Sequence, residues 1–348
     1  MKLSAIPYFP WCISRDAAEK RAFTLVEILV SLVVLSVIVV LVSLLLNAAT
    51  KTITSSGKHM NADSQARLIL NRMAVDFSDM VQRTDIDYSS FKQPSGTLSP
   101  QYNNSVVPAN LQTANAGNPG NDQCAFYAKG VGYFLSGSTP PASSSRSALA
   151  LVGYNMATDP YFYGGQRPVL QRIGKGLGWE SDPAGSYLSL SYLPVTLTSQ
   201  WPSLFSSDPD WKTVGDQVFR FEYNYLLKPN YSSATTPYPS KLSNTPYWDS
   251  TTNKMMPTNP HTCINGFQDV AAIVVSIAVL DSTSDVIVSN SNTALAKSLP
   301  DAVEGADIRS SWLTIINSST FAKNAGIPQE AASAVRVYER YIYLAPPQ

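Results

Sequence analysis

The pattern of apolar and polar positions divides the chain into an apolar beginning and a long mixed remainder. Residues Ile28–Leu46 carry no charge and are interrupted only by three serines. Because an α-helix rises about 1.5 Å per residue, this run of about 19 residues can cross a hydrocarbon core of about 30 Å. It is also longer than the apolar part of an ordinary secretory signal. We therefore predict a membrane-spanning helix over residues 23–46.

A second helical pattern follows a polar stretch at residues 47–58. Apolar residues recur there at spacings of three and four, which is typical of one face of an amphipathic helix. These residues are Ala62, Ala66, Ile69, Met73, Phe77 and Met80. The opposite face is polar and carries Asp63, Gln65, Arg67, Asn71, Asp76, Asp79 and Arg83. We expect residues 47–83 to continue the helix and to pack their apolar face on a globular domain.

Segments rich in β-branched and aromatic residues follow and predict strands. They are Ala125–Leu135, Ala148–Tyr154, Pro168–Ile173, Tyr187–Leu193, Gln217–Leu227, Asp269–Leu280 and Val335–Leu344. Polar and aromatic residues alternate over 218–225, which predicts a half-buried strand, whereas the nearly apolar stretch 269–281 predicts a central one. Residues Thr293–Leu299 and Ile308–Ile316 are candidates for short helices.

Turn-forming residues dominate the connections between these segments. Surface loops are expected at 84–122, Ser136–Ser147, Tyr231–Thr262 and Ser282–Ser291, and a turn is expected at Gly174–Gly178. The predicted fold class is α+β, with a long N-terminal helix packed on an antiparallel sheet that carries large loop insertions. The predicted divisions are 1–22, 23–46, 47–83 and a β-rich globular domain at 84–348.

Charge gives the orientation of the membrane span and excludes one class of partner. Lys20 and Arg21 precede the apolar run, so the positive-inside rule places the N-terminus in the cytoplasm and residues 47 onward across the membrane. Charged residues make up only 14% of the chain and the net charge is zero. No nucleic-acid partner is therefore expected.

The boundary Lys20-Arg21-Ala22-Phe23-Thr24-Leu25-Val26-Glu27 carries the most specific signal. It resembles the prepilin cleavage and methylation motif of type IV pilins and type II secretion pseudopilins. The resemblance implies that a prepilin peptidase removes a cytoplasmic leader, residues 1–22, by cutting between Ala22 and Phe23, and that the new amine is N-methylated. The family usually has glycine before the cut, so Ala22 bears on the efficiency of cleavage.

Glu27 is the fifth residue after the expected cut, where the family has its glutamate. A carboxylate at the start of a membrane span costs up to a few kcal/mol and needs a partner. The resemblance implies that this partner is the free amine of Phe23 of a neighbouring subunit. The expected partners are therefore other pilin-like subunits, the prepilin peptidase/methyltransferase and the inner membrane, with the globular domain in the periplasm.

Two finer resemblances concern the kind of subunit. The segment Ala66–Phe77, with an early Arg, apolar residues and a late Asp, is similar to the first helix of J-type pseudopilins and W-type minor pilins. The whole-chain pattern and the stretch Val335–Leu344 resemble a group of large prepilin-motif proteins in Verrucomicrobia-like gene cassettes, the cassette protein C type. The large globular part favours a minor subunit, because bulky domains crowd in a repeating filament.

The cysteines and the histidines limit the chemistry of the globular part. Cys12 would leave with the leader, so a disulfide between Cys124 and Cys263 is plausible in an oxidising compartment, the alternative being two unpaired thiols. His59 and His261 are the only histidines, so no catalytic site, metal or cofactor is expected. Five acidic residues could form a calcium site, but solvated loop charges are the favoured interpretation. They are Asp281, Asp285, Asp301, Glu304 and Asp307.

The sequence therefore favours a structural subunit of a pilin-like filament, and not an enzyme. A filament-tip adhesin or ligand-binding module on the same anchor, and a membrane-anchored envelope enzyme, remain as alternatives. The apolar run could also be a plain signal anchor, or a secretory signal cut after Ala48 or Ala49. Secretion, adhesion, motility and DNA uptake all remain open as the system that the subunit serves.

Overall fold

The computed structural model describes most of the predicted helices and strands, but not all of the segments that connect them. The described residues are 24–82, 89–91, 121–130, 149–159, 167–178, 188–189, 211–229, 239–243, 267, 269–288, 292–301 and 305–345. The chain divides into two compact units, Met1–Ser55 and Ser56–Gln348, and each has its own internal contacts.

Helix α1, Leu25–Ser78, is one continuous helix of 54 residues, as the two helical patterns predicted. It continues through the polar stretch at 47–58, where the hydroxyls of Thr50 and Thr52 donate to carbonyl oxygens four residues earlier, at 2.8 and 3.0 Å. In the second unit the predicted apolar stripe is confirmed, because all six of its side chains, from Ala62 to Met80, are at most 4% exposed.

Two sheets pack on this stripe, where the sequence predicted a single one. A six-stranded sheet has the order β1-β2-β3-β4-β5 with β6 also pairing β4, and a four-stranded sheet has the order β10-β9-β7-β8. All pairs are antiparallel except β4 with β5. The strands are β1 (Ser89–Phe91), β2 (Gln123–Ala128), β3 (Ala150–Asp159), β4 (Arg167–Gly178), β5 (Leu188–Ser189), β6 (Lys212–Gly215), β7 (Val218–Leu227), β8 (Lys241–Ser243), β9 (Val270–Val279) and β10 (Arg336–Tyr343).

Both sheets contribute to the core that covers α1, with Phe126 and Tyr154 from one and Phe221 and Val275 from the other. The link between the sheets comes from the residues just before β2. The amide of Phe221 donates to the side-chain oxygen of Asn121 at 2.7 Å, and the amide of Tyr223 donates to Asp122 at 3.1 Å. These bonds occupy the part of the β7 edge that the short strand β8 does not cover.

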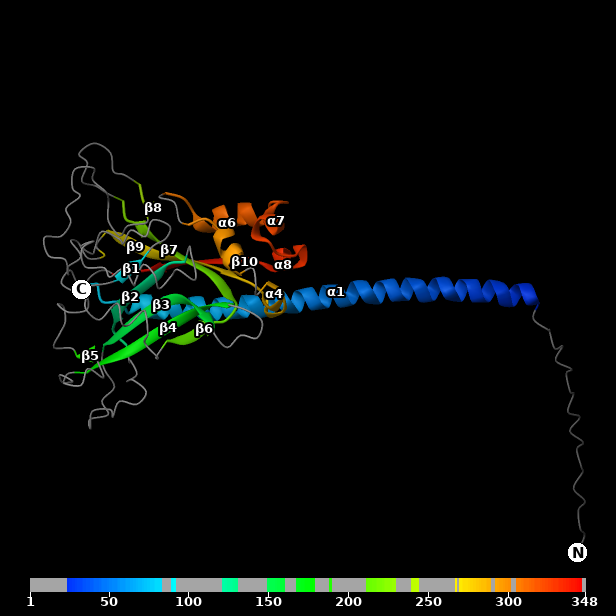
Figure 1. Ribbon diagram of the computed structural model, residues 1–348, viewed down its shortest axis with the longest axis horizontal. Coiled ribbons are helices and arrows are strands. Elements are labelled where there is room, and N and C mark those ends of the chain that lie inside the picture. Colours follow the sequence, from blue (N-terminus) through cyan, green and yellow to red (C-terminus); the bar gives the residue numbers. More distant parts are fainter. Residues whose placement is uncertain are drawn as a thin grey trace, which may run out of the picture. The chain divides into compact units, whose positions relative to one another are not determined.

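A layer of short helices covers the other face of the four-stranded sheet (Figure 1). These helices are α4 (Ser282–Val288), α5 (Asn292–Ser298), α6 (Ile308–Ile316), α7 (Phe321–Ala325) and α8 (Gln329–Ala334). The layer buries an apolar cluster that includes Trp312, Phe321 and Val337. The sheet is consequently enclosed between this layer and the C-terminal part of α1.

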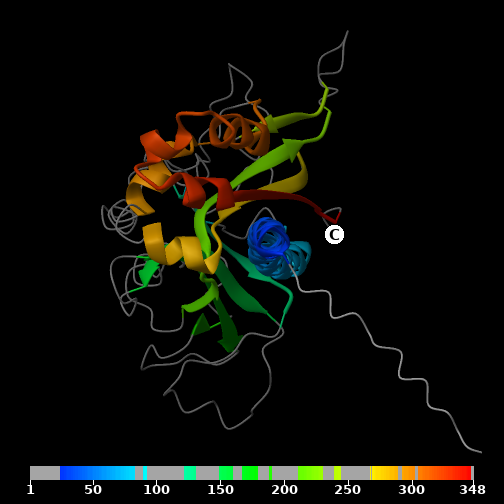
Figure 2. The ribbon, with the colours of Figure 1, turned by 90° about the vertical axis from the view of Figure 1, so that its right-hand side faces the viewer.

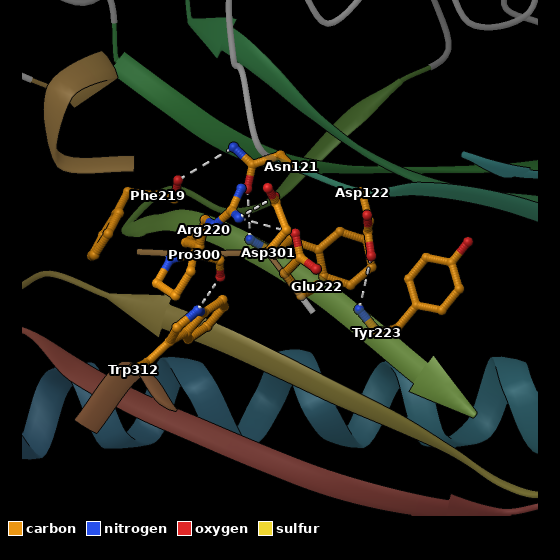
Figure 3. A network of polar contacts seen from close by, with 10 residues as sticks. Asn121, Asp122, Phe219, Arg220, Glu222, Tyr223, Pro300, Asp301 and Trp312 are labelled. Atoms are coloured by element: carbon orange, nitrogen blue, oxygen red, sulfur yellow. Dashed lines mark hydrogen bonds and ion pairs between the residues drawn. The ribbon is translucent and has the colours of Figure 1, made fainter. Parts of the chain in front are cut away.

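The helical layer overturns the prediction of a half-buried strand at 218–225. Strand β7 is buried on both faces, and Arg220 and Glu222 are fully enclosed. Arg220 pairs with Glu222 at 3.1 Å and with Asp301 at 2.6 Å, while its guanidinium lies 5.8 Å from the centre of the Trp312 ring (Figure 3). Alternation predicted the two faces correctly, but it could not show that ion pairs would allow the polar face to be covered.

Two of the predicted loops contain a short strand, β1 within 84–122 and β8 within Tyr231–Thr262. Two other loop or turn predictions are wrong over most of their length, and each has a local cause. Residues 282–288 form α4, because the side chain of Asp281 accepts from the amides of Thr283 and Ser284 at 3.1 and 3.3 Å and so caps the helix. The glycine-rich stretch at 174–178 belongs to strand β4. A Cβ at Gly174 would come within 2.7 Å of the Arg172 guanidinium, so the glycine leaves room for that side chain to lie along the strand.

Arg172 uses this room to reach Asp76 on α1. The two side chains form hydrogen bonds of 2.6 and 2.9 Å, and the hydroxyl of Tyr154 donates to the same carboxylate. Asp76 is 5% exposed, although the helical pattern predicted it on the solvated face. Burial and the neighbouring carboxylate raise the pKa of Tyr154 well above its usual value. This ionic cluster fixes where α1 lies along β3 and β4.

Replacing Asp76 by asparagine should destabilise the globular unit by about 3–5 kcal/mol, because it leaves the Arg172 guanidinium without its counter-charge in a buried site. Arg72→Ala is the matched control, because it removes an exposed partner of the same carboxylate, 3.3 Å away and 50% exposed, and should cost less than about 1 kcal/mol. Denaturant unfolding of the full chain in detergent measures both. Equal losses of stability in the two variants would show that the buried Asp76–Arg172 pair contributes no more than the exposed Asp76–Arg72 pair.

The raised pKa of a second carboxyl group, that of Glu339, makes the stability of the protein depend on pH. Burial, followed by its hydrogen bond with Asp307, raises the pKa of Glu339 to about 7. The folded protein therefore binds this proton more tightly than the unfolded chain does, so the contribution is complete below about pH 4.5 and is lost as the pH rises to about 7. The variant Glu339→Gln keeps the neutral form at every pH.

We expect Glu339→Gln to raise the melting temperature relative to the parent at pH 8, and to change it little at pH 5. Differential scanning fluorimetry at both pH values measures the difference. Glu330→Gln, which removes an exposed acid from the first turn of α8, is the control and should show no such dependence. Parallel pH profiles for the two variants would contradict the assignment.

Candidate functional site

The first turn of α1 combines a helix cap with an acidic residue. The amide of Glu27 donates to the hydroxyl of Thr24 at 3.3 Å and to its carbonyl oxygen at 3.0 Å, so Thr24 occupies the position that caps the helix. The order Thr-x-x-Glu is that of a capping box. A negative charge in the first turn also interacts favourably with the helix dipole. Helix start and acidic residue are therefore set by four consecutive residues.

The apolar helix that follows could span a membrane by its length and composition. The candidate span is Leu25–Ile53, 29 residues, and its most apolar window of 18 residues has a mean hydropathy of 3.3 and no buried residue. Its hydroxyls are satisfied within the helix, because Ser36 donates to Val33 at 2.7 Å and Ser43 to Val39 at 2.8 Å. Lipid can therefore surround these serine positions without leaving a hydroxyl unpaired.

The structure places one of the three predicted processing and assembly residues. Glu27 lies on α1 with its side chain exposed. No basic side chain among the described residues lies within ion-pair distance of its carboxylate. Ala22 and Phe23 lie outside the described residues. The predicted cut and the predicted amine partner of Glu27 therefore remain predictions.

For the predicted disulfide, too, the structure describes only one of the residues concerned. Cys124 is buried in strand β2, 1% exposed, and Cys263 lies outside the described residues. Strand β2 leads from the Asn121–Asp122 link into the core under α1, so Cys124 sits at the joint between the two sheets. The pairing of Cys124 with Cys263 stays a prediction.

Three of the acidic residues considered as calcium ligands instead make separate contacts within the protein. Asp285 pairs with Arg167 at 2.8 Å, Asp301 pairs with Arg220 at 2.6 Å, and Asp307 caps α6 through the amide of Arg309 at 3.0 Å. In the parts of the chain that the structure describes, no three His, Cys, Asp or Glu residues are grouped as metal ligands. Glu304 lies outside those parts.

Two of these acids correct the expectation of solvated loop charges. Asp281 and Asp285 are 2% and 3% exposed. Burial raises the pKa of Asp285 to about 6 even though Arg167 opposes the shift, and Asp216 and Asp281 raise it further. Arg167 belongs to β4, so this ion pair holds α4 against the six-stranded sheet. The role of these acids is therefore to attach the helical layer.

Sequence reasoning missed one set of contacts between β10 and the part of α1 that belongs to the second unit. The Arg336 guanidinium contacts His59 Nε2 at 2.9 Å, Tyr338 donates to Asp63, and Arg340 donates to Asn71. Asp63 and Asn71 lie on the face predicted to be solvated, and the strand residues alternate along β10. Alternating polar residues near the chain end were the available signal, but nothing in the sequence indicated that they face α1.

Comparison with known proteins identifies the N-terminal segment. The family model described as the prokaryotic N-terminal methylation motif matches residues 18–43, which include Glu27 and most of the apolar span. No curated protein and no solved structure matches the chain. Beside the capped first turn and the apolar helix, the match supports a structural subunit, not an enzyme. The chain therefore carries a prepilin-type N-terminal motif on a membrane-anchor helix, which supports a cleaved and methylated subunit of the type IV pilin or pseudopilin kind.

Proposed function

We propose that this chain is a minor pilin or pseudopilin, a structural subunit cut before Phe23, N-methylated there and assembled into a type IV pilus-like or type II secretion pseudopilus filament. One observation carries the proposal: the methylation motif at 18–43 coincides with the start of a helix that is apolar on all sides. Such a helix needs lipid or other apolar helices around it. The same helix continues into the core of the globular unit, so it joins an anchor to a folded domain.

Glu27 supplies the assembly step in this proposal. Its carboxylate is exposed in the first turn of α1, which carries no other charge before Lys51, and a buried or membrane-inserted carboxylate is costly without a cation. Removal of the leader creates a new amine at Phe23, four positions earlier. Within one chain this amine belongs to the same helix start, whereas the amine of a neighbouring subunit can approach from the side. Cleavage and subunit pairing thereby become linked.

The proposed location follows from the same helix. The chain sits in the inner membrane with residues 1–22 in the cytoplasm, and its globular domain lies in the periplasm or, within a filament, at the cell surface. The size of the globular domain, residues 84–348, favours a minor subunit of the J, W or cassette type. A tip adhesin and an envelope enzyme remain alternatives, and no described residue specifically favours either.

Mass spectrometry of the purified protein tests the processing step. In a host that contains a prepilin peptidase, we expect the mature chain to begin at N-methylated Phe23, in spite of alanine at the preceding position. Ala22→Gly should raise the processed fraction, because the family usually has glycine there. An intact leader in both forms would leave a signal-anchored protein, and a start near Ala49 would show a secreted one; either result refutes the proposal.

The variant Glu27→Ala tests assembly separately from processing. It should still be cut and should insert in the membrane, but incorporation into sheared filaments should fall by tenfold or more, or about 1.4 kcal/mol, because the subunit amine loses its counter-charge. Ser31→Ala is the control one turn further along, because it removes only a hydroxyl that bonds within the helix. Immunoblots of filament and membrane fractions measure the distribution. Normal incorporation of Glu27→Ala would remove Glu27 from the assembly step.

A further inference from the structure

Strand β10 forms one border of the four-stranded sheet, and among the strands that the structure describes only β9 pairs with it. The amide of Leu344 donates to Ala271 at 3.1 Å, so this pair is hydrogen-bonded. The register between β10 and β9 is regular from Arg336 to Tyr343. Because hydrogen-bonded and non-hydrogen-bonded pairs alternate in an antiparallel ladder, the even-numbered residues of β10 bond to β9. The odd-numbered residues direct their amides and carbonyls away from the sheet.

Four residues therefore present backbone groups at the open edge: Val337, Glu339, Tyr341 and Tyr343. Among the residues that the structure describes, none of these outward amides or carbonyls has a hydrogen-bond partner. At the end of the strand, the side chains of Tyr341 and Tyr343 are 39% and 68% exposed. A long edge of this kind is a template for a further strand.

The contacts of β10 with α1 leave this edge accessible. They come from the even-numbered side chains, Arg336, Tyr338 and Arg340, which point to one face of the sheet. Val337 and Glu339 point to the opposite face, toward the helical layer. In Figure 2, β10 (red) passes beside α1 (blue) between these two neighbours. The helices thus hold the faces of β10, while its edge stays open.

The charge beside the edge favours a negative partner. Arg336 and Arg340 stand four residues apart on the α1 face of β10, and neither is paired with a carboxylate among the described residues. Arg67 of α1 lies close enough to affect the neighbouring Tyr338. Asp63, which accepts a hydrogen bond from Tyr338, is the acid that partly balances these positive charges. A strand added here would place two of its side chains opposite Arg336 and Arg340, as direct cross-strand neighbours.

A second copy of the chain fits this edge poorly. An antiparallel pair of β10 strands requires a two-fold axis that reverses the strand direction. The contacts of β10 with α1 advance in the same order along both elements, from His59 with Arg336 to Asn71 with Arg340, so α1 would be reversed as well. In such a pair centred on Tyr338, Arg336 and Arg340 of one copy would also lie directly opposite Arg340 and Arg336 of the other, and like charges directly opposite one another are destabilising.

We propose that the open edge of β10 binds an extended, acidic segment of another protein as an added antiparallel strand. The backbone groups of Val337, Glu339, Tyr341 and Tyr343 would form the new ladder. Arg336 and Arg340 would select acidic side chains four residues apart, and the exposed side chains of Tyr341 and Tyr343 would cover the apolar residues directly opposite them. This interaction surface lies in the globular unit and does not depend on the proposed filament function.

Fluorescence anisotropy with the full-length protein in detergent tests the proposal. The probe is a labelled eight-residue peptide in which glutamate alternates with valine, and its twin carries lysine in place of glutamate. We expect the acidic peptide to bind about tenfold more tightly, because two favourable charge pairs replace two repulsive ones. Arg340→Gln should reduce this preference. Equal binding of both peptides, or no binding of either, would overturn the proposal.

Proline substitution tests whether the peptide uses the edge. Tyr341→Pro removes an outward amide and leaves the ladder with β9 intact, so it should abolish binding, whereas Tyr341→Thr keeps the amide and should retain it. Tyr343→Pro is a second edge variant in case the first fails to fold, and circular dichroism checks each. Equal binding by the proline and threonine variants would refute strand addition. A dimer that sediments as such and dissociates on Tyr341→Pro would show a second copy as the occupant, against the proposal.

Discussion

The packing of one helical stripe against two sheets is the constraint on which the rest of this structure depends. Residues of α1 from Ala62 to Phe77, with Met80 just after the helix, lie in a single core with strands of both sheets. If each fully buried apolar side chain contributes about 1.5–3 kcal/mol, this stripe is a large part of the stabilisation of the globular unit. The same helix is exposed and largely apolar over Leu25–Leu46, so one secondary-structure element supplies both the candidate membrane span and part of the core.

Charged groups inside the globular unit give this packing its register. Apolar side chains tolerate small sliding movements, but the carboxylate of Asp76 must meet Arg172, and the guanidinium of Arg220 must meet Glu222 and Asp301. A buried charge that loses its partner is far more costly than one that keeps it. The first pair fixes α1 on β3 and β4, and the second fixes the segment before α6 on β7. These ion pairs therefore select one arrangement among several that the apolar residues would allow.

The features that relate to function lie at two ends of the described chain. The methylation motif and the capped first turn lie at the beginning of α1. There Glu27 and the apolar residues after it are the features on which the proposed assembly role depends. The open strand β10 is close to the end of the chain, and its faces are held by α1 and by the helical layer. In such a subunit the N-terminal helix would serve for anchoring and assembly, and the edge of β10 would remain available to bind another protein.

The sequence by itself determined the elements whose signal is local. The apolar run and the spacing of Ala62, Ala66 and their successors were sufficient to predict α1. β-branched composition predicted β7, β9 and β10 to within one residue of their observed ends, but it ended β3 and β4 five residues too early. The motif around Glu27 was also readable, because it depends on residue order alone. Only the tertiary structure decided that there are two sheets and that the polar side of β7 is covered. It also decided that Asp76 is buried. These outcomes depend on partners such as Arg172 and Asp301, which are distant in sequence, and no periodicity in the chain reports which charge a distant segment will meet.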